Sequence, residues 1–277
     1  MIRQLEQVGD WARLADQLDH CVVVIPEGEF MRGSDNGRWD EVPQQKVFLD
    51  PYEIDRYEIT NIQYQRFVQA AAVKAPPYWI GAAFPEGQAD FPVVGVTWEE
   101  AGAYCQWLGK RLPTEAEWEK ACRSSDGRVY PWGDAWEAGF GNTGPLAISS
   151  NPVDMGPGLW DRLWTILQAR PSGANVRGLR PVGSYPAGAS PYGVLDLVGN
   201  ASEWVADWYG FADYSLLPLR NPQTLGPKWN HALRGSSWFD ANGDLVWVQD
   251  QSRCSARNSS HTPRDARTGF RCARSIP

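Results

Sequence analysis

The side chains that most often carry chemistry, cysteine and histidine, are few and scattered in this chain. Its five cysteines stand far apart at positions 21, 105, 122, 254 and 272, and no two form a C-x-x-C motif. The three histidines, His20, His231 and His261, are too widely spaced for an H-x-x-x-H metal site. The sequence also lacks a glycine-rich phosphate loop with its lysine and a G-x-S-x-G nucleophile motif. No familiar motif of metal, phosphate or acyl chemistry is therefore present.

A cluster of three glutamates has a structural explanation. Glu115, Glu117 and Glu119 follow Thr114, and the spacing Thr114-x-x-Glu117 is that of a helix capping box. Carboxylates in the first turn of a helix also interact favourably with its dipole. We interpret these residues as a helix start rather than as a pair for acid–base catalysis.

The most unusual composition lies between residues 239 and 268, where short polar side chains alternate with tryptophan. Antibody-like binding surfaces have this mixture, since rigid aromatic groups supply contact area and short polar groups supply adaptable hydrogen bonds. The candidate ligand-binding residues are Asp240, Asn242, Trp247, Gln249, Asn258, Ser260 and His261. Their side chains should be exposed on one face, with Trp238 and Phe270 buried beneath them. The alternative interpretation is an ordinary pair of polar loops.

Local patterns predict short strands and a few helices around these segments. Residues 1–20 have apolar side chains at helical spacing, which predicts an N-terminal helix preceding the main domain. Strands are expected at 21–25 and 47–54, and a short inserted helix at 158–168. Further helices should begin where a side chain can cap the first turn, after Thr60 or Asn61, after Thr97 and after Thr114.

Composition narrows the class of protein. Hydrophobic residues make up 43% of the 277 residues and include 15 Trp, while 27 Gly and 21 Pro favour loops and short strands over a helical bundle. The net charge of −7 argues against a nucleic-acid surface. We find neither a signal peptide nor an apolar run of the roughly 18 residues that a membrane span needs. A soluble protein, cytoplasmic by default, is expected.

Four segments carry a resemblance to a known family. They are Ala103–Arg123, Gly193–Trp204, Leu233–Trp238 and Gly269–Cys272. Together they resemble the formylglycine-generating enzyme domain, a variant of the C-type lectin fold. The resemblance implies a loop-rich α+β fold with one domain at 21–277, whose C-terminal segment 234–273 would bind the ligand.

The resemblance also implies roles for the cysteines. In the family, the positions of Cys105 and Cys272 form one structural disulfide, and those of Cys122 and Cys254 form another. The enzyme's two copper-ligating cysteines correspond to Asp240 and Leu245 here. Because copper(I) prefers soft thiolates, an aspartate and a leucine cannot take their place. No copper is therefore expected, and formylglycine formation is disfavoured.

By the same resemblance, one segment is expected to bind calcium. The ligands would be the side chain of Asp196, the main-chain carbonyls of Gly199 and Ala201, and the carboxylate of Glu203. Such a set suits calcium, which takes six to eight oxygen ligands and accepts backbone carbonyls from a tight turn. The alternative is a packed turn whose carboxylates accept hydrogen bonds from backbone amides.

Two functions follow from these observations. The first is a non-catalytic protein that binds an unknown protein or small molecule through residues 239–268. Its C-terminal segment also resembles the variable proteins of diversity-generating retroelements, which carry a ligand-binding stretch between similar sequences. The second is an oxidoreductase of the same superfamily, which includes iron-dependent sulfoxide synthases, with an unrecognised metal site.

Overall fold

The computed structural model describes residues 11–143, 178–210, 213–239, 245–260, 262 and 264–276. The expected helix at 158–168 lies outside these residues, as do Asp240, Asn242 and His261. The elements in chain order are α2 (Trp11–Asp19), β1 (Val22–Ile25), β2 (Gly28–Arg32), β3 (Gln45–Leu49), β4 (Tyr52–Asp55), α3 (Asn61–Ala71), α4 (Trp98–Trp107), α5 (Glu115–Arg123), η2 (Pro186–Gly188), β5 (Ser202–Tyr209), η3 (Asp213–Leu216), β6 (Asn230–Arg234), α7 (Leu245–Gln251), β7 (Asn258–Ser260), β8 (Thr268–Phe270) and β9 (Ala273–Ser275). Short strands and helices joined by long connections confirm the predicted loop-rich α+β class.

The described strands form three small sheets. One has the order β1-β4-β9, the second pairs β2 with β3, and the third has the order β7-β6-β5-β8. In the third sheet β5 runs parallel to β8, while its other pairs are antiparallel. Pairing of β9 with β4 places the end of the chain beside its N-terminal quarter.

The single strand expected at 47–54 is two strands, which is a correction. β3 pairs with β2 and β4 pairs with β1, so the chain changes sheets at Asp50 and Pro51. Pro51 has no backbone N–H for a ladder. The backbone N–H of Asp50 instead donates to the side chain of Asn221 at 2.9 Å. The break depends on a contact from far along the sequence, which a local pattern does not reveal.

The predicted helix starts are confirmed. Thr97 and Glu100 form one capping box, and Thr114 and Glu117 form another. At α3 the cap is Thr60, whose backbone N–H donates to the side chain of Gln63 at 3.0 Å. The N-terminal helix α2 buries its apolar face against α3 and is part of the packed body.

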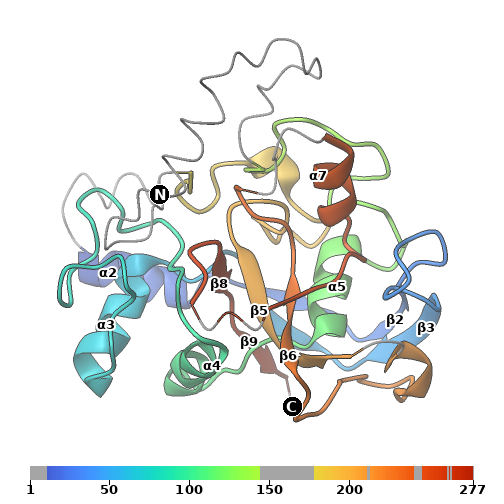
Figure 1. Cartoon of the computed structure of the whole chain (residues 1–277), viewed down its shortest axis with the longest axis horizontal. Helices are drawn as coiled ribbons and strands as arrows, with labels where there is room; N and C mark the ends of the chain where they lie inside the picture. Colours follow the sequence, from blue (N-terminus) through green and yellow to red (C-terminus); the bar gives the residue numbers. More distant parts are fainter. Residues whose placement is uncertain are drawn as a thin grey trace.

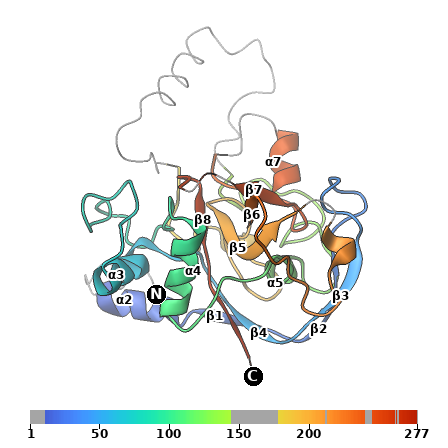
Figure 2. The same ribbon diagram turned by 60° about the horizontal axis from the view of Figure 1, so that its bottom comes forward.

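The four-stranded sheet lies between α4 and α5 (Figures 1 and 2). Successive residues of β5 supply both faces, because side chains alternate along a strand. Trp204 packs into the cluster that includes α3 and α4, whereas Val205 packs into the cluster that includes α5. No helix within the described ranges is long and apolar enough to cross a membrane.

The two disulfides predicted from the family resemblance are present. Cys105 of α4 is bonded to Cys272, and Cys122 of α5 to Cys254. The Cα atoms are 5.6 Å apart in both pairs, within the usual range of roughly 4.4–6.8 Å. Each disulfide thus ties a helix flanking the sheet to the C-terminal segment.

Candidate functional site

Three largely buried segments flank or interrupt the predicted ligand-binding stretch 239–268. We call them the frame. They are Leu233–Trp238, Ser252–Arg257 and Gly269–Cys272. Each contributes one fully buried arginine, namely Arg234, Arg257 and Arg271. A buried charge must be paired to be tolerated, so the partners of these arginines show how the frame is held.

Helix α5 supplies the partners of the first two arginines. Arg234 donates to Glu119 at 2.7 Å, and Arg257 donates to both oxygens of Glu115 at 3.0 and 2.7 Å. These glutamates are therefore more than first-turn charges that favour the helix dipole. Removing one member of such a pair leaves an uncompensated buried charge and typically costs about 3–5 kcal/mol.

Strand β5 supplies the third partner. Arg271 donates from Nε and Nη2 to the two oxygens of Glu203, each at 2.7 Å. Its remaining donors reach the main-chain carbonyls of Asp55, Arg56 and Leu195 at 2.9–3.2 Å. A single guanidinium thus joins strand β5, the end of β4 and the frame.

Two buried carboxylates beside the frame have pKa values that differ from their ordinary values. Burial alone would raise the pKa of Glu115, but the charges of Arg257 and Arg234 lower it below its ordinary value. Asp207 lies beside it and accepts hydrogen bonds from the backbone N–H groups of Glu115 at 2.8 Å and Thr224 at 2.6 Å. Burial, and then repulsion by Glu115, raise the pKa of Asp207 to about 7.

The described members of the predicted ligand set lie on two elements. Trp247 and Gln249 lie on α7, and Asn258 and Ser260 lie on the edge strand β7. Trp247 is 50% exposed, while the other three are half-buried. Residues two apart on a helix point in different directions, so Trp247 and Gln249 do not share one face of α7.

Beneath these elements most of the frame is buried. Phe270 and the four disulfide cysteines are buried as expected, and so are most residues of Ser252–Arg257. Trp238 was expected to be buried but is half-buried, with its ring packed edge-on against Phe239 at a centroid distance of 5.3 Å. It lies at the boundary between the frame and the exposed stretch.

Sequence reasoning missed other exposed apolar residues near α7. Val246 is 73% exposed and precedes Trp247, and Trp39 in the loop between β2 and β3 is 60% exposed. That loop reaches α7 through Arg38, whose Nε lies 3.9 Å from an oxygen of Asp250. An exposed tryptophan in a polar loop was a visible signal, but nothing in the local sequence connects residue 39 to residue 247.

The two positions that correspond to the family's copper-ligating cysteines are not cysteines in this chain. Leu245 begins α7 with a partly exposed side chain, and Asp240 lies outside the described residues. The remaining cysteine, Cys21, is half-buried, and burial raises the pKa of its thiol. Over the described ranges, no three His, Cys, Asp or Glu side chains are grouped as a metal site.

Three of the four predicted calcium ligands lie in the turn before β5, and the fourth, Glu203, lies on β5 itself. Asp196 has a left-handed backbone conformation with φ of +59°, and one of its oxygens accepts from the backbone N–H of Gly183 at 2.7 Å. Glu58 accepts from the backbone N–H of Ala201 at 2.8 Å and from the side chain of Asn200 at 2.6 Å. Glu203 is the carboxylate paired with Arg271.

Buried carboxylates outnumber buried cations around this turn. Three buried carboxylates, Glu58, Asp196 and Glu203, face the single guanidinium of Arg271. Burial and mutual repulsion raise the pKa of Glu58 well above its ordinary value and that of Asp196 to about 6. Because only Asp196 and Glu203 of the predicted set are carboxylates, main-chain carbonyls would have to complete the coordination. Glu203 would then bind the ion while it also pairs with Arg271.

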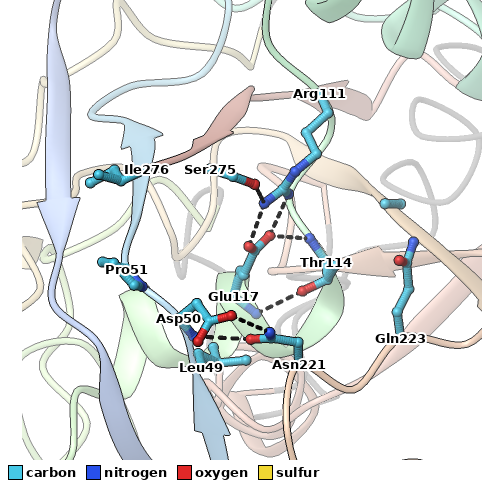
Figure 3. A pocket seen from close by; sticks show the side chains of 11 residues that line it. Leu49, Asp50, Pro51, Arg111, Thr114, Glu117, Asn221, Gln223, Ser275 and Ile276 are labelled. Carbon is cyan, nitrogen blue, oxygen red and sulfur yellow. Dashed lines mark hydrogen bonds and ion pairs between the residues drawn. The ribbon is translucent and has the colours of Figure 1, made fainter.

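A pocket of about 270 Å³ lies at the end of the molecule where β9 ends, away from α7 (Figures 1 and 3). Most of its polar side chains bind one another. Arg111 donates to both oxygens of Glu117 at 2.6 Å and to the hydroxyl of Ser275 at 3.0 Å, while Asn221 binds Asp50. The pocket includes none of the predicted ligand residues. We therefore assign it no ligand.

Comparison with family models and curated proteins gives consistent results. The model of the sulfatase-modifying factor enzyme 1-like domain matches residues 10–276. A serine/threonine-protein kinase pkn1 of Chlamydia caviae is 32% identical over 274 residues, which cover 92% of this chain and 38% of that protein. The chain therefore spans about two fifths of that relative. Two bovine (Bos taurus) proteins are each 30% identical, covering 91% and 96% of this chain and 74% and 91% of theirs: a formylglycine-generating enzyme and an inactive C-alpha-formylglycine-generating enzyme 2.

Solved structures share the same architecture. PvdO from Pseudomonas aeruginosa superimposes with a TM-score of 0.65 at 25% identity, covering 92% of this chain and 94% of that one. Treponema denticola variable protein 1 superimposes with a TM-score of 0.60 at 19% identity, covering 92% and 95%. At this identity the second likeness concerns the fold alone.

Proposed function

Because the chain belongs to the sulfatase-modifying factor enzyme 1-like domain family, as predicted from its sequence, we propose that it is a non-catalytic member that binds a ligand through segment 234–273. The main support is the replacement of the two copper-ligating positions by Asp240 and Leu245. The four cysteines that match family positions are all bonded in disulfides, so they supply no thiolate ligand. Copper-dependent oxidation of a substrate cysteine then has no ligand pair to start from.

The arrangement of the C-terminal segment supports binding. Its frame is held by two disulfides and by the buried pairs of Arg234, Arg257 and Arg271, whereas α7 between the frame segments exposes Val246 and Trp247. Neighbouring exposed apolar side chains that form a contiguous patch often mark an interaction site. Binding residues held by rigid neighbours also lose little entropy when a ligand binds.

Overall likeness does not distinguish the two functions. The bovine enzyme and the bovine inactive relative are equally similar to this chain, at 30% identity. The choice therefore depends on the copper positions. The resemblance to variable proteins motivates the finer proposal that a retroelement diversifies the C-terminal segment. A reverse-transcriptase gene and a near-copy of the codons for residues 234–272 beside the gene would support it, and their absence would count against it.

We also propose that the turn of Asp196, Gly199, Ala201 and Glu203 binds a structural calcium ion. The excess of buried carboxylates over cations in this turn is the supporting observation. Bound calcium would supply positive charge among these carboxylates and hold the turn that precedes β5.

The binding function can be tested without knowing the ligand. Wild type and a Val246→Ser, Trp247→Ser and Gln249→Ser variant are screened against arrays of purified proteins, glycans and metabolites. The variant should lose the interactions of the wild type while its free energy of unfolding stays within about 1 kcal/mol, since surface substitutions are usually nearly neutral.

The matched control carries Ile80→Ser and Leu216→Ser, two residues at least as exposed but outside the segment. It should keep the interactions. If the control loses them equally, binding lies elsewhere. Conversion of a peptide cysteine to formylglycine by the copper-loaded protein would favour the oxidoreductase alternative instead.

A further inference from the structure

We propose that α7 and two loops from distant parts of the chain form one surface that binds a cationic, apolar segment of a partner protein. This inference rests on the proposed function and names the partner class of the same site. We define the α7 surface as Val246 and Trp247 of α7 with Trp39, Asp35 and Glu137 from the two loops. The loops are residues 34–44, between β2 and β3, and residues 130–140, after α5.

The first loop is joined to α7 by a network of charges. Arg253, just after α7, donates to both oxygens of Glu41 and to Asp250, each at 2.6 Å. Arg38 of the same loop lies within ion-pair distance of Asp250. Because Asp250 is three residues after Trp247, the two side chains share a face of the helix. Trp39 directly follows Arg38 in this loop.

The second loop approaches the same helix. The hydroxyl of Tyr130 donates to the carbonyl of Gln249 at 3.3 Å. The backbone N–H of Cys254 donates to the carbonyl of Val129 at 2.8 Å. Behind this contact, Tyr130 stacks on Trp132 at a centroid distance of 5.4 Å, which gives the loop an aromatic base. Figure 2 shows α7 projecting from the body, and in both views the 34–44 loop lies on the same side of the molecule (Figures 1 and 2).

The shape of this surface favours a protein segment over a small molecule. Small ligands are bound in concave pockets that enclose most of their surface. Here the exposed apolar side chains of α7 and Trp39 stand on projecting elements. Tryptophans in such positions commonly dominate the binding energy of protein interfaces.

The charge around the surface favours a cationic partner. The exposed acids in the segments next to α7 are Asp35, Asp126, Asp134 and Glu137. The nearby cations, Arg38, Arg128 and Arg253, are each in an ion pair with a carboxylate. Such a surface repels anionic lipids and nucleic acids, and it attracts lysine or arginine side chains.

The test uses two defined probes and calorimetry. One peptide of about twelve residues alternates lysine with leucine, and its counterpart alternates glutamate with leucine. We expect the lysine peptide to bind the wild-type chain at least tenfold more tightly than the glutamate peptide at about 50 mM NaCl. The preference should shrink at about 500 mM NaCl, where surface charges are screened.

Two variants separate the contributions to binding. Trp39→Ala should weaken the lysine peptide at least about tenfold. Asp35→Asn with Glu137→Gln should weaken it about threefold at low salt only, because rim charges act mainly through long-range attraction. The asparagine keeps the oxygen that accepts from the backbone N–H of Gln44. Glu99→Gln, an exposed carboxylate on α4, is the matched control and should change binding less than about twofold.

Each other result overturns the inference in a recognisable way. Equal binding of both peptides would refute the cationic partner and leave the binding function intact. An unchanged affinity in Trp39→Ala would remove the 34–44 loop from the surface. An equal loss of affinity in Glu99→Gln would show that the lysine peptide is attracted by the overall negative charge of the protein. If neither peptide bound, a cationic, apolar partner segment would be rejected. The array experiment tests the binding function independently.

Discussion

The frame and helix α7 are neighbours in sequence, yet they are held by different forces. The frame contains arginines that are fully buried and paired with carboxylates of α5 and β5, and it is linked by two disulfides. Helix α7 exposes most of its first turn. Its C-terminal end is held by the ion pair between Asp250 and Arg253. In the function that we propose, stability and recognition belong to adjacent segments, so a substitution in one should have little effect on the other.

The largest expected effect comes from the disulfides. Cys105→Ala with Cys272→Ala opens a loop that spans 167 residues, and the chain-entropy model predicts a loss of about 5 kcal/mol in the free energy of unfolding. Urea denaturation measures the loss. Cys21→Ala, at the unpaired cysteine, is the control. A loss below about 1 kcal/mol for the double variant would show that the frame does not depend on this bond.

The buried ion pairs come next. Arg271→Met leaves Glu203 buried without its partner and should cost about 3–5 kcal/mol. Arg274→Met, three residues later, breaks only an exposed pair with Glu53 and should cost less than about 1 kcal/mol. Similar costs for the two variants would contradict the distinction between frame and surface.

A pH titration tests the buried carboxylate of Asp207, which lies beside the frame. The pKa of Asp207 is raised to about 7 in the folded state, so the folded protein binds this proton more tightly than the unfolded chain. Its stabilisation is complete below pH about 4 and is lost as the pH rises to about 7. The stability of the wild type relative to Asp207→Asn should therefore fall over this range, by an amount on the order of 3 kcal/mol. A flat difference would mean that Asp207 titrates normally.

Calcium should act on the turn before β5. If the ion binds only the folded state, a hundredfold excess over Kd adds about 2.7 kcal/mol to stability, and EGTA reverses it. Asp196→Asn keeps an oxygen that accepts from the backbone N–H of Gly183, and asparagine tolerates the left-handed backbone. This variant removes the charge with little other change, and it should lose the calcium response. An unchanged melting temperature on adding calcium or EGTA would count against the site.

The smallest effects are expected on α7 itself. Val246→Ala should change the free energy of unfolding by less than about 0.5 kcal/mol, because this side chain is exposed. Val248→Ala, two residues later and fully buried, should cost about 2 kcal/mol. Equal costs would mean that α7 is packed on both faces, contrary to a binding surface.

The sequence predicted what depends on local patterns and on family resemblance. Thr97 and Thr114 cap helices because the glutamate three residues later completes each box, and the cysteine pairs followed from the family. The partner of Arg257, Glu115, is 142 residues away, and only the folded chain shows it. The ion pair between Arg38 and Asp250 of α7 was likewise invisible, since the two residues are far apart in sequence and share no local pattern.

The pairing of β9 with β4 has a consequence for how this protein is presented. It fixes the C-terminal strand at the end of the molecule away from α7 (Figures 1 and 2). A tether attached there would hold the chain by its base and leave the helix pointing outward. The chain matches only 38% of its chlamydial relative, so the same domain also occurs within larger proteins. In such a protein, a neighbouring domain joined at β9 would leave the proposed binding surface uncovered.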